Sequence, residues 1–362
     1  MTSRIAYLLE NDRQSRVLGV TFTRKAAGEM QNRLRALLSQ SALGQGDHQH
    51  AHDDVVAVND DSHSGSPAPQ GLDRVTLGTF HSVCAKILRW NGNLLSSLPS
   101  ISRDMAGSPN ATVLDQSFAI IDEGAQIRIL RECMEEAEID LNDLGLKIKP
   151  VLSAIAKCRA QFAQGKKPFE SNKPLSKAML VALTTYSRYR ERLLSANCLD
   201  FDDLIFLTRE MLSTHDDVRE MLQRRWPHVL VDEFQDTSRS QIDLVKLLTS
   251  SSLLVVGDAD QSIYSWRGAH ATSLSDLEKE FSDRLGGVKT VYLMENYRST
   301  SNIVRAAQKL ISHKSDRNSH ADKLRQDMKP QRGAGPVPRV ISFDDSASEG
   351  KNHKWTGRAF VS

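Results

Sequence analysis

The sequence predicts an α/β fold built on a parallel sheet, with a long helical segment inserted into it. Two short apolar runs, Val229–Val231 and Leu253–Val256, each break abruptly into carboxylates. A buried parallel strand is typically a continuous apolar run, and in open α/β sheets ligands lie outside the carboxyl ends of the strands. A third run, Arg16–Phe22, leads directly into a helical pattern. We therefore expect a functional site at the strand ends.

The first strand end carries Asp232 and Glu233. An aspartate in this place can hold Mg²⁺ against nucleotide phosphates, while a neighbouring carboxylate can take a proton from the attacking water. Taken alone, the pair also fits an exposed turn without a catalytic part. The residues that follow the second strand favour the nucleotide interpretation.

Polar and then aromatic residues follow the second strand end. They are Asp258, Asp260, Gln261, Tyr264, Trp266 and Arg267. The first three supply further polar groups at the level of the phosphates. Aromatic rings interleaved with arginine form a platform on which unpaired bases stack.

These residues resemble a known family. Val-Asp-Glu-Phe-Gln-Asp-Thr from Val231, and Val-Gly-Asp-Ala-Asp-Gln-Ser-Ile-Tyr-Ser-Trp-Arg-Gly-Ala from Val256, resemble motifs II and III of the UvrD/Rep/PcrA-like helicases of superfamily 1. The resemblance implies a RecA-like motor domain, ATP and Mg²⁺ as cofactors, and single-stranded and forked DNA as partners. It assigns metal binding to Asp232 and Glu233, catalysis to Glu233 and Gln261, nucleotide contacts to Asp232 and Gln261, and DNA contacts to Tyr264 and Trp266.

The N-terminal region fits the same family. Arg4–Leu9 reads as the end of a helix and Arg16–Phe22 as a buried strand, and Thr23 is a suitable cap for the helix that follows. This segment resembles motif Ia, which implies that Phe22 and Thr23 contact single-stranded DNA. Arg24 replaces the asparagine usual in the family, and without the resemblance Phe22 is more simply a core residue.

A second predicted DNA contact follows a low-complexity insert. Residues 43–72 are rich in His, Asp, Ser, Gly and Pro, so we expect a disordered surface loop. Arg74–Ser82 then reads as a strand that ends in hydroxyls and a histidine, and it resembles motif Ib. The resemblance makes His81 a DNA contact, whereas by itself it fits a structural histidine.

The middle of the chain, residues 83–197, has a helical pattern with amphipathic runs at 125–137 and 180–194. In the family this region is subdomain 1B. Its basic residues either line a DNA path or form a solvated helix face; they include Lys147, Lys149, Lys157, Arg159, Lys166 and Lys167. At the return to the sheet, we expect Asp200 to cap the next helix rather than to bind a metal.

The C-terminal region resembles motif IV at residues 290–300. Arg298 is then a catalytic residue that approaches the γ-phosphate, and Tyr297 stacks on the adenine. Without the motif, Arg298 reads as a surface residue. A helix over Ser301–His313 and a strand over Pro338–Phe343 are expected to follow.

Composition limits the class of protein. The chain has 362 residues, 40% of them hydrophobic and 25% charged, and a net charge of only +2, so any DNA surface must be local. Four scattered cysteines argue against zinc and disulfides. No signal peptide or membrane-spanning run is apparent. We expect a soluble intracellular protein, in the nucleus if eukaryotic and otherwise in the cytoplasm; nothing indicates its oligomeric state.

The resemblance divides the chain into family domains. Residues 1–82 and 198–298 correspond to motor domain 1A, residues 83–197 to subdomain 1B, and residues 299–362 to the start of domain 2A with an aberrant tail. No Walker A sequence, G-x-x-x-x-G-K-[ST], and no motifs V or VI occur. We therefore expect an incomplete 3′–5′ DNA helicase that does not hydrolyse ATP alone. A truncated, non-catalytic product that binds DNA or a partner is the alternative.

Overall fold

The computed structural model describes residues 1–43, 71–106, 114–163, 174–262, 278, 281–282, 286–312, 328–339 and 341–342. The chain consists of two compact units, Met1–Gly286 and Gly287–Ser362. Most of the predicted insert, residues 44–70, lies outside the described residues, and its described edges belong to a helix and a 3₁₀ turn.

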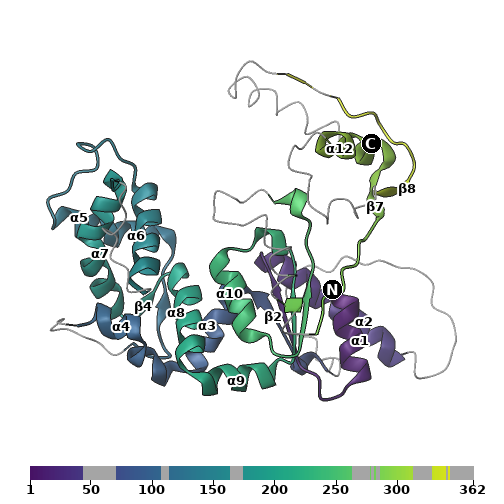
Figure 1. Ribbon diagram of the computed structural model, residues 1–362, viewed down its shortest axis with the longest axis horizontal. Helices are drawn as coiled ribbons and strands as arrows, with labels where there is room; N and C mark the ends of the chain where they lie inside the picture. The colour runs from purple at the N-terminus through teal and green to yellow at the C-terminus, as the bar shows by residue number, and fades with distance from the viewer. Residues whose placement is uncertain are drawn as a thin grey trace, which may run out of the picture. The chain divides into compact units, whose positions relative to one another are not determined.

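A parallel sheet with the strand order β2-β1-β5-β6 forms the centre of the first unit (Figure 1). Its strands are β1 (Val17–Thr21), β2 (Val75–Thr79), β5 (His228–Val231) and β6 (Ser252–Val255). Every residue of β1 is buried, as expected of a central strand. The strand order reverses between β1 and β5, which is where open α/β sheets bind their ligands.

Helices cover both faces of this sheet. On one face, α1 (Thr2–Asn11) and α2 (Arg24–Leu43) form a core with Val17 and Leu230. On the other face, Leu18, Val20 and Val229 pack in the larger core. The helices of that core are α3 (Phe80–Trp90), α8 (Phe201–Thr214), α9 (Asp216–Arg225) and α10 (Arg239–Leu248).

The sequence predictions for the N-terminal helix and strand are confirmed by α1 and β1. Thr23 caps α2 as predicted, because its hydroxyl accepts a hydrogen bond from the amide of Ala26 at 3.1 Å. Ser82 donates to and accepts from Thr79 in a capping box, so the helix after β2 begins at the strand end.

A helical insertion with a core of its own lies between β2 and β5. Its helices are α4 (Pro99–Asp104), α5 (Glu123–Glu135), α6 (Ile148–Ala163) and α7 (Lys177–Ser195). Residues of α5, α6 and α7 form the separate core, which includes Leu130, Val151 and Leu193. The short strands β3 (Ala119–Ile120) and β4 (Cys198–Leu199) pair in parallel and connect the insertion to the sheet region.

Asp200 caps α8 as predicted: its carboxylate accepts from the amide of Asp203 at 2.8 Å. The interpretation of Arg159 as a basic surface residue is wrong. Arg159 is 2% exposed, and both nitrogens at its tip donate to the buried carboxylate of Asp200. Lys147 and Lys149 are exposed, whereas Lys166 and Lys167 lie outside the described residues.

The second unit contains β7 (Glu295–Thr300), α12 (Ser301–Ser312) and β8 (Lys329–Arg332). The helix begins at Ser301 as predicted. The strand predicted over Pro338–Phe343 is wrong: its described residues, 338–339 and 341–342, form no strand, and β8 pairs with β7 instead. Pro336 and Pro338 lack amide hydrogens and therefore cannot donate to a strand ladder.

The helices of the described residues fall short of a membrane-spanning helix. None of them combines the length and the apolar character that crossing a bilayer requires.

Candidate functional site

The carboxyl ends of the four parallel strands lie at one edge of the sheet. Thr23 follows β1, His81 follows β2, Asp232 and Glu233 follow β5, and Asp258 follows β6. Backbone hydrogen bonds extend the sheet into this edge, since the amide of Asp232 donates to Val20 at 2.9 Å and that of Val256 to Val231 at 2.9 Å. The sheet thus brings these predicted site residues to a single edge.

Glu233 has an unusual backbone conformation. Its φ is +50°, in the left-handed region that side chains with a Cβ rarely adopt. A short 3₁₀ turn, Phe234–Asp236, follows it. The amide of Phe234 donates to Val256 at 3.0 Å, so the turn is attached to the end of β6. The side chain of Glu233 is exposed, as a group that meets a substrate must be.

A buried glutamine connects the two strand ends. Gln235 is 3% exposed, and its amide nitrogen donates to Oε2 of Glu233 at 2.8 Å. Its amide oxygen accepts from the backbone amide of Asp258 at 3.0 Å. Gly257 allows this close approach, because a Cβ there would lie 2.7 Å from the same oxygen.

Asp258 extends the connection to Gln261. The amide nitrogen of Gln261 donates to Oδ2 of Asp258 at 2.9 Å, and the backbone amide of Asp260 donates to Oδ1 at 3.1 Å. Hydrogen bonds therefore link Glu233 to Gln261 through Gln235 and Asp258. The sequence patterns assign no role to Gln235. Its position two residues after Glu233 is the feature that could have indicated one.

Asp232 is half-buried beside Glu233. Burial, and then the charge of Glu233, raise the pKa of the Asp232 carboxyl. Two carboxylates whose charges repel suit a hard divalent cation, since Mg²⁺ prefers oxygen ligands. In the described part of the chain, no three His, Cys, Asp or Glu side chains are grouped to hold a metal.

The predicted DNA contacts differ in exposure. Thr23 is exposed and Phe22 is half-buried. The ring of His81 lies edge-on to Phe201, with centroids 5.6 Å apart, and burial lowers its pKa. Tyr264 and Trp266 lie outside the described residues.

Tyr297 and Arg298 belong to the second unit. The hydroxyl of Tyr297 donates to Glu295, whose hydrogen bond and charge raise the tyrosine pKa. Arg298 is exposed, and its carbonyl accepts from Arg332 at 2.8 Å. Their approach to a nucleotide stays a prediction.

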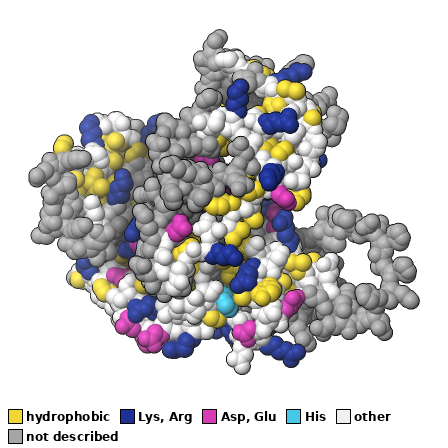
Figure 2. Space-filling model, turned by 45° about the vertical axis from the view of Figure 1, so that its right-hand side comes forward, with side chains coloured by type: hydrophobic (Ala, Val, Ile, Leu, Met, Phe, Trp, Pro, Cys, Tyr) yellow, Lys and Arg dark blue, Asp and Glu magenta, His cyan; other side chains and the backbone are white. Residues whose placement is uncertain are grey.

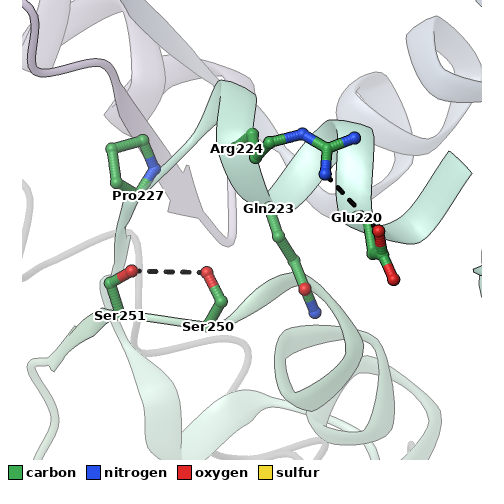
Figure 3. Close-up of a pocket in the computed structure, with 6 residues that line it drawn as sticks. All are labelled: Glu220, Gln223, Arg224, Pro227, Ser250 and Ser251. Atoms are coloured by element: carbon green, nitrogen blue, oxygen red, sulfur yellow. Dashed lines mark hydrogen bonds and ion pairs between the residues drawn. The ribbon is translucent and has the colours of Figure 1, made fainter. Parts of the chain in front are cut away.

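A pocket of about 270 Å³ lies at the opposite edge of the sheet (Figure 3). Pro227 and Ser251 directly precede β5 and β6, so the pocket is at the amino ends of the strands. The lining residues are Glu220, Gln223, Arg224, Pro227, Ser250 and Ser251. This pocket is therefore distinct from the site that contains Glu233.

Comparison with known proteins agrees with the geometry. Residues 1–282 match the UvrD/REP helicase N-terminal domain. The ATP-dependent DNA helicase PcrA of Staphylococcus aureus is 32% identical over 325 residues, which are 88% of this chain and 36% of the relative. That of Staphylococcus epidermidis is 30% identical over 338 residues, 90% of this chain and 38% of the relative.

The chain thus spans little more than a third of the length of these curated relatives. The parallel sheet with helices on both faces confirms the predicted RecA-like fold class. On the family match and these identities, the chain belongs to the UvrD/REP helicase family.

Proposed function

We propose that this chain forms part of an ATP-dependent DNA helicase that moves 3′ to 5′ along single-stranded DNA and opens forked DNA. The observation that carries the proposal is the hydrogen-bonded connection from Glu233 to Gln261 at the carboxyl edge of the sheet. This connection joins Glu233, which is suited to activating water, to Gln261, which is suited to sensing the γ-phosphate. DNA as substrate places the protein inside the cell, in the nucleus or the cytoplasm.

Each site residue has a part in this proposal. Asp232 and Glu233 would hold Mg²⁺, which when bound neutralises charge on the nucleotide phosphates. Glu233 accepts a proton from the attacking water. Gln261 contacts the γ-phosphate together with Arg298, and Tyr297 stacks on the adenine.

Single-stranded DNA would cross the same edge of the sheet, with contacts from Phe22, Thr23, His81, Tyr264 and Trp266. A basic surface for DNA would be local, because the net charge of the chain is only +2. On the face drawn in Figure 2, Lys and Arg side chains are interspersed with hydrophobic, acidic and uncharged ones. We assign residues 1–82 and 198–298 to motor domain 1A, residues 83–197 to subdomain 1B, and residues 299–362 to the start of domain 2A.

DNA binding by residues 1–362 tests the proposal. Fluorescence anisotropy with a labelled oligothymidylate should show binding that Trp266→Ala weakens by about 1–3 kcal/mol, the contribution of one stacked base. Trp90→Ala is the control, because Trp90 is 47% exposed but ends α3, away from the strand ends where that helix begins. Equal affinities of the two variants would remove the stacking platform from the DNA path.

A further inference from the structure

A buried ionic cluster lies where the helical insertion meets the motor core. Its charged members are two arginines of the insertion, Arg159 on α6 and Arg190 on α7, and three aspartates. The aspartates are Asp104 at the end of α4 and Asp200 and Asp203 at the start of α8. All five side chains are at most 5% exposed.

Arg159 joins α6 to α8. Its two terminal nitrogens donate to the two oxygens of Asp200 at 3.0 and 2.6 Å, and its Nε lies 3.2 Å from Asp203. The hydroxyl of Tyr189, on α7, donates to Asp200 at 3.0 Å. A paired, planar contact of this kind fixes orientation as well as distance.

Arg190 joins α7 to both α4 and α8. Its Nη1 donates to both oxygens of Asp203 at 2.8 Å, and its Nε donates to Asp104 at 2.9 Å. Asp203 also accepts from the amide of Asp200 at 3.1 Å within the capping box. The first turn of α8 is thus held by two helices of the insertion at once.

Buried ion pairs contribute little net stability, because removing the charges from water offsets their attraction. Apolar side chains of similar volume often replace such pairs without loss of stability. Charged groups, however, accept few alternative packings, which suits a contact that has to specify one orientation. The cluster joins helices of two different hydrophobic cores, because α6 and α7 contribute to the core of the insertion and α8 to the larger core beside the sheet.

The turn that holds Asp200 and Asp203 also carries a residue that contacts a predicted DNA contact. Phe201 stands between Asp200 and Asp203 in the first turn of α8, is 38% exposed, and makes the edge-on contact with His81. A rotation of this turn would therefore alter the contact between Phe201 and the imidazole of His81.

We propose that Arg159, Arg190 and their three aspartates form an orienting joint, which fixes the helical insertion on the motor core and holds Phe201 against His81. The five charged residues act as positioning residues. This inference rests on the proposed function in one respect, namely that His81 contacts DNA.

Distance measurements on residues 1–362 test the joint without DNA. Spin labels at Gln31→Cys on α2 and Asp143→Cys in the insertion report its orientation by double electron–electron resonance; both positions are exposed. Cys198→Ser removes the one native cysteine that is not buried. The double variant Arg159→Met/Asp200→Asn removes both charges, while Asn retains the helix cap.

We expect the melting temperature of the double variant to lie closer to that of the wild type than the melting temperature of Arg159→Met alone does. We nevertheless expect the double variant to show a broader distance distribution than the wild type. We also expect the pKa of His81, measured by NMR, to rise toward the ordinary value as Phe201 moves. Lys149→Met, which removes an exposed ion pair with Glu123, is the control. It should change neither the distance distribution nor the pKa of His81. An unbroadened distribution overturns the joint, and an unchanged His81 pKa overturns its link to His81.

Discussion

The side-chain oxygen of Gln235 accepts a hydrogen bond from the backbone amide of Asp258 at 3.0 Å. A residue that follows β5 is thereby attached to the loop that follows β6. Because the other half of the same amide holds Glu233, any movement of the β6 loop reaches the carboxylate through one rigid planar group.

Replacing Gln235 by Met, which has a similar shape and no amide, should destabilise the chain. The amide of Asp258 loses its partner, and an unsatisfied polar group in a partly buried place costs about 1–3 kcal/mol. Urea denaturation of residues 1–362 measures the effect, with the exposed Gln31→Met as the control. Equal stability of the two variants would mean that water replaces the glutamine without loss.

Gly257→Ala and Gly28→Ala should have opposite effects. A Cβ at Gly257 would lie 2.7 Å from the oxygen of Gln235 and 3.3 Å from two backbone nitrogens, so the connection must distort. A Cβ at Gly28, inside α2, meets nothing within 4 Å and should stabilise the helix by about 0.5–1 kcal/mol. Thermal melting of both variants measures these effects. An increase in melting temperature for Gly257→Ala would contradict the structure.

Glu233→Gly should be more stable than Glu233→Ala. The left-handed backbone at φ +50° costs a residue with a Cβ about 1–2 kcal/mol, whereas glycine adopts it freely. Chemical denaturation of the two variants isolates the backbone effect, since both lack the carboxylate. If alanine proves as stable as glycine, the backbone at this position is not strained.

Acidification should destabilise the first unit through two histidines. Burial lowers the pKa of His81, and burial together with the charge of Arg4 lowers that of His228. The folded state therefore binds a proton less readily than the unfolded chain. This stability is complete above about pH 6.5 and is lost as the pH falls through 6.5 toward the folded pKa.

Each histidine contributes at most about 1.4 kcal/mol per pH unit to this slope. Denaturation between pH 7.5 and 5.5 should show a smaller slope in His81→Gln/His228→Gln than in the wild type. Identical slopes would show that neither imidazole is protected from protonation.

Local patterns predicted the elements well, and long-range contacts could not be predicted in the same way. Asp200 was expected to cap α8 because capping depends on neighbours in sequence. Its second role, as partner of Arg159, depends on a residue 41 positions earlier in the chain, and no periodicity reveals such a pair. For the same reason, Arg159 was interpreted as a surface residue.

The same distinction between local patterns and long-range contacts applies to the candidate site. Strand ends and motifs predict Asp232, Glu233 and Gln261 as site residues, whereas the contacts of Gln235 with Glu233 and Asp258 depend on the adjacency of β5 and β6. At Pro338–Phe343 the apolar content predicts a strand, whereas β7 pairs with the polar segment Lys329–Arg332. Which segment pairs with a strand depends on long-range contacts, and a local pattern does not reveal them.

The place of the insertion between β2 and β5 also has a consequence for how the chain folds. Ser15, just before β1, and His228, at the start of β5, are bonded across a separation of 213 residues. Local contacts form quickly, whereas contacts between distant segments must first overcome the entropy of closing a long loop. During synthesis the insertion can therefore complete its own core while the fully buried β1 still lacks its partner β5. Until β5 emerges, one edge of β1 presents unpaired amides and carbonyls beside apolar side chains, so the chain is prone to aggregation during this interval.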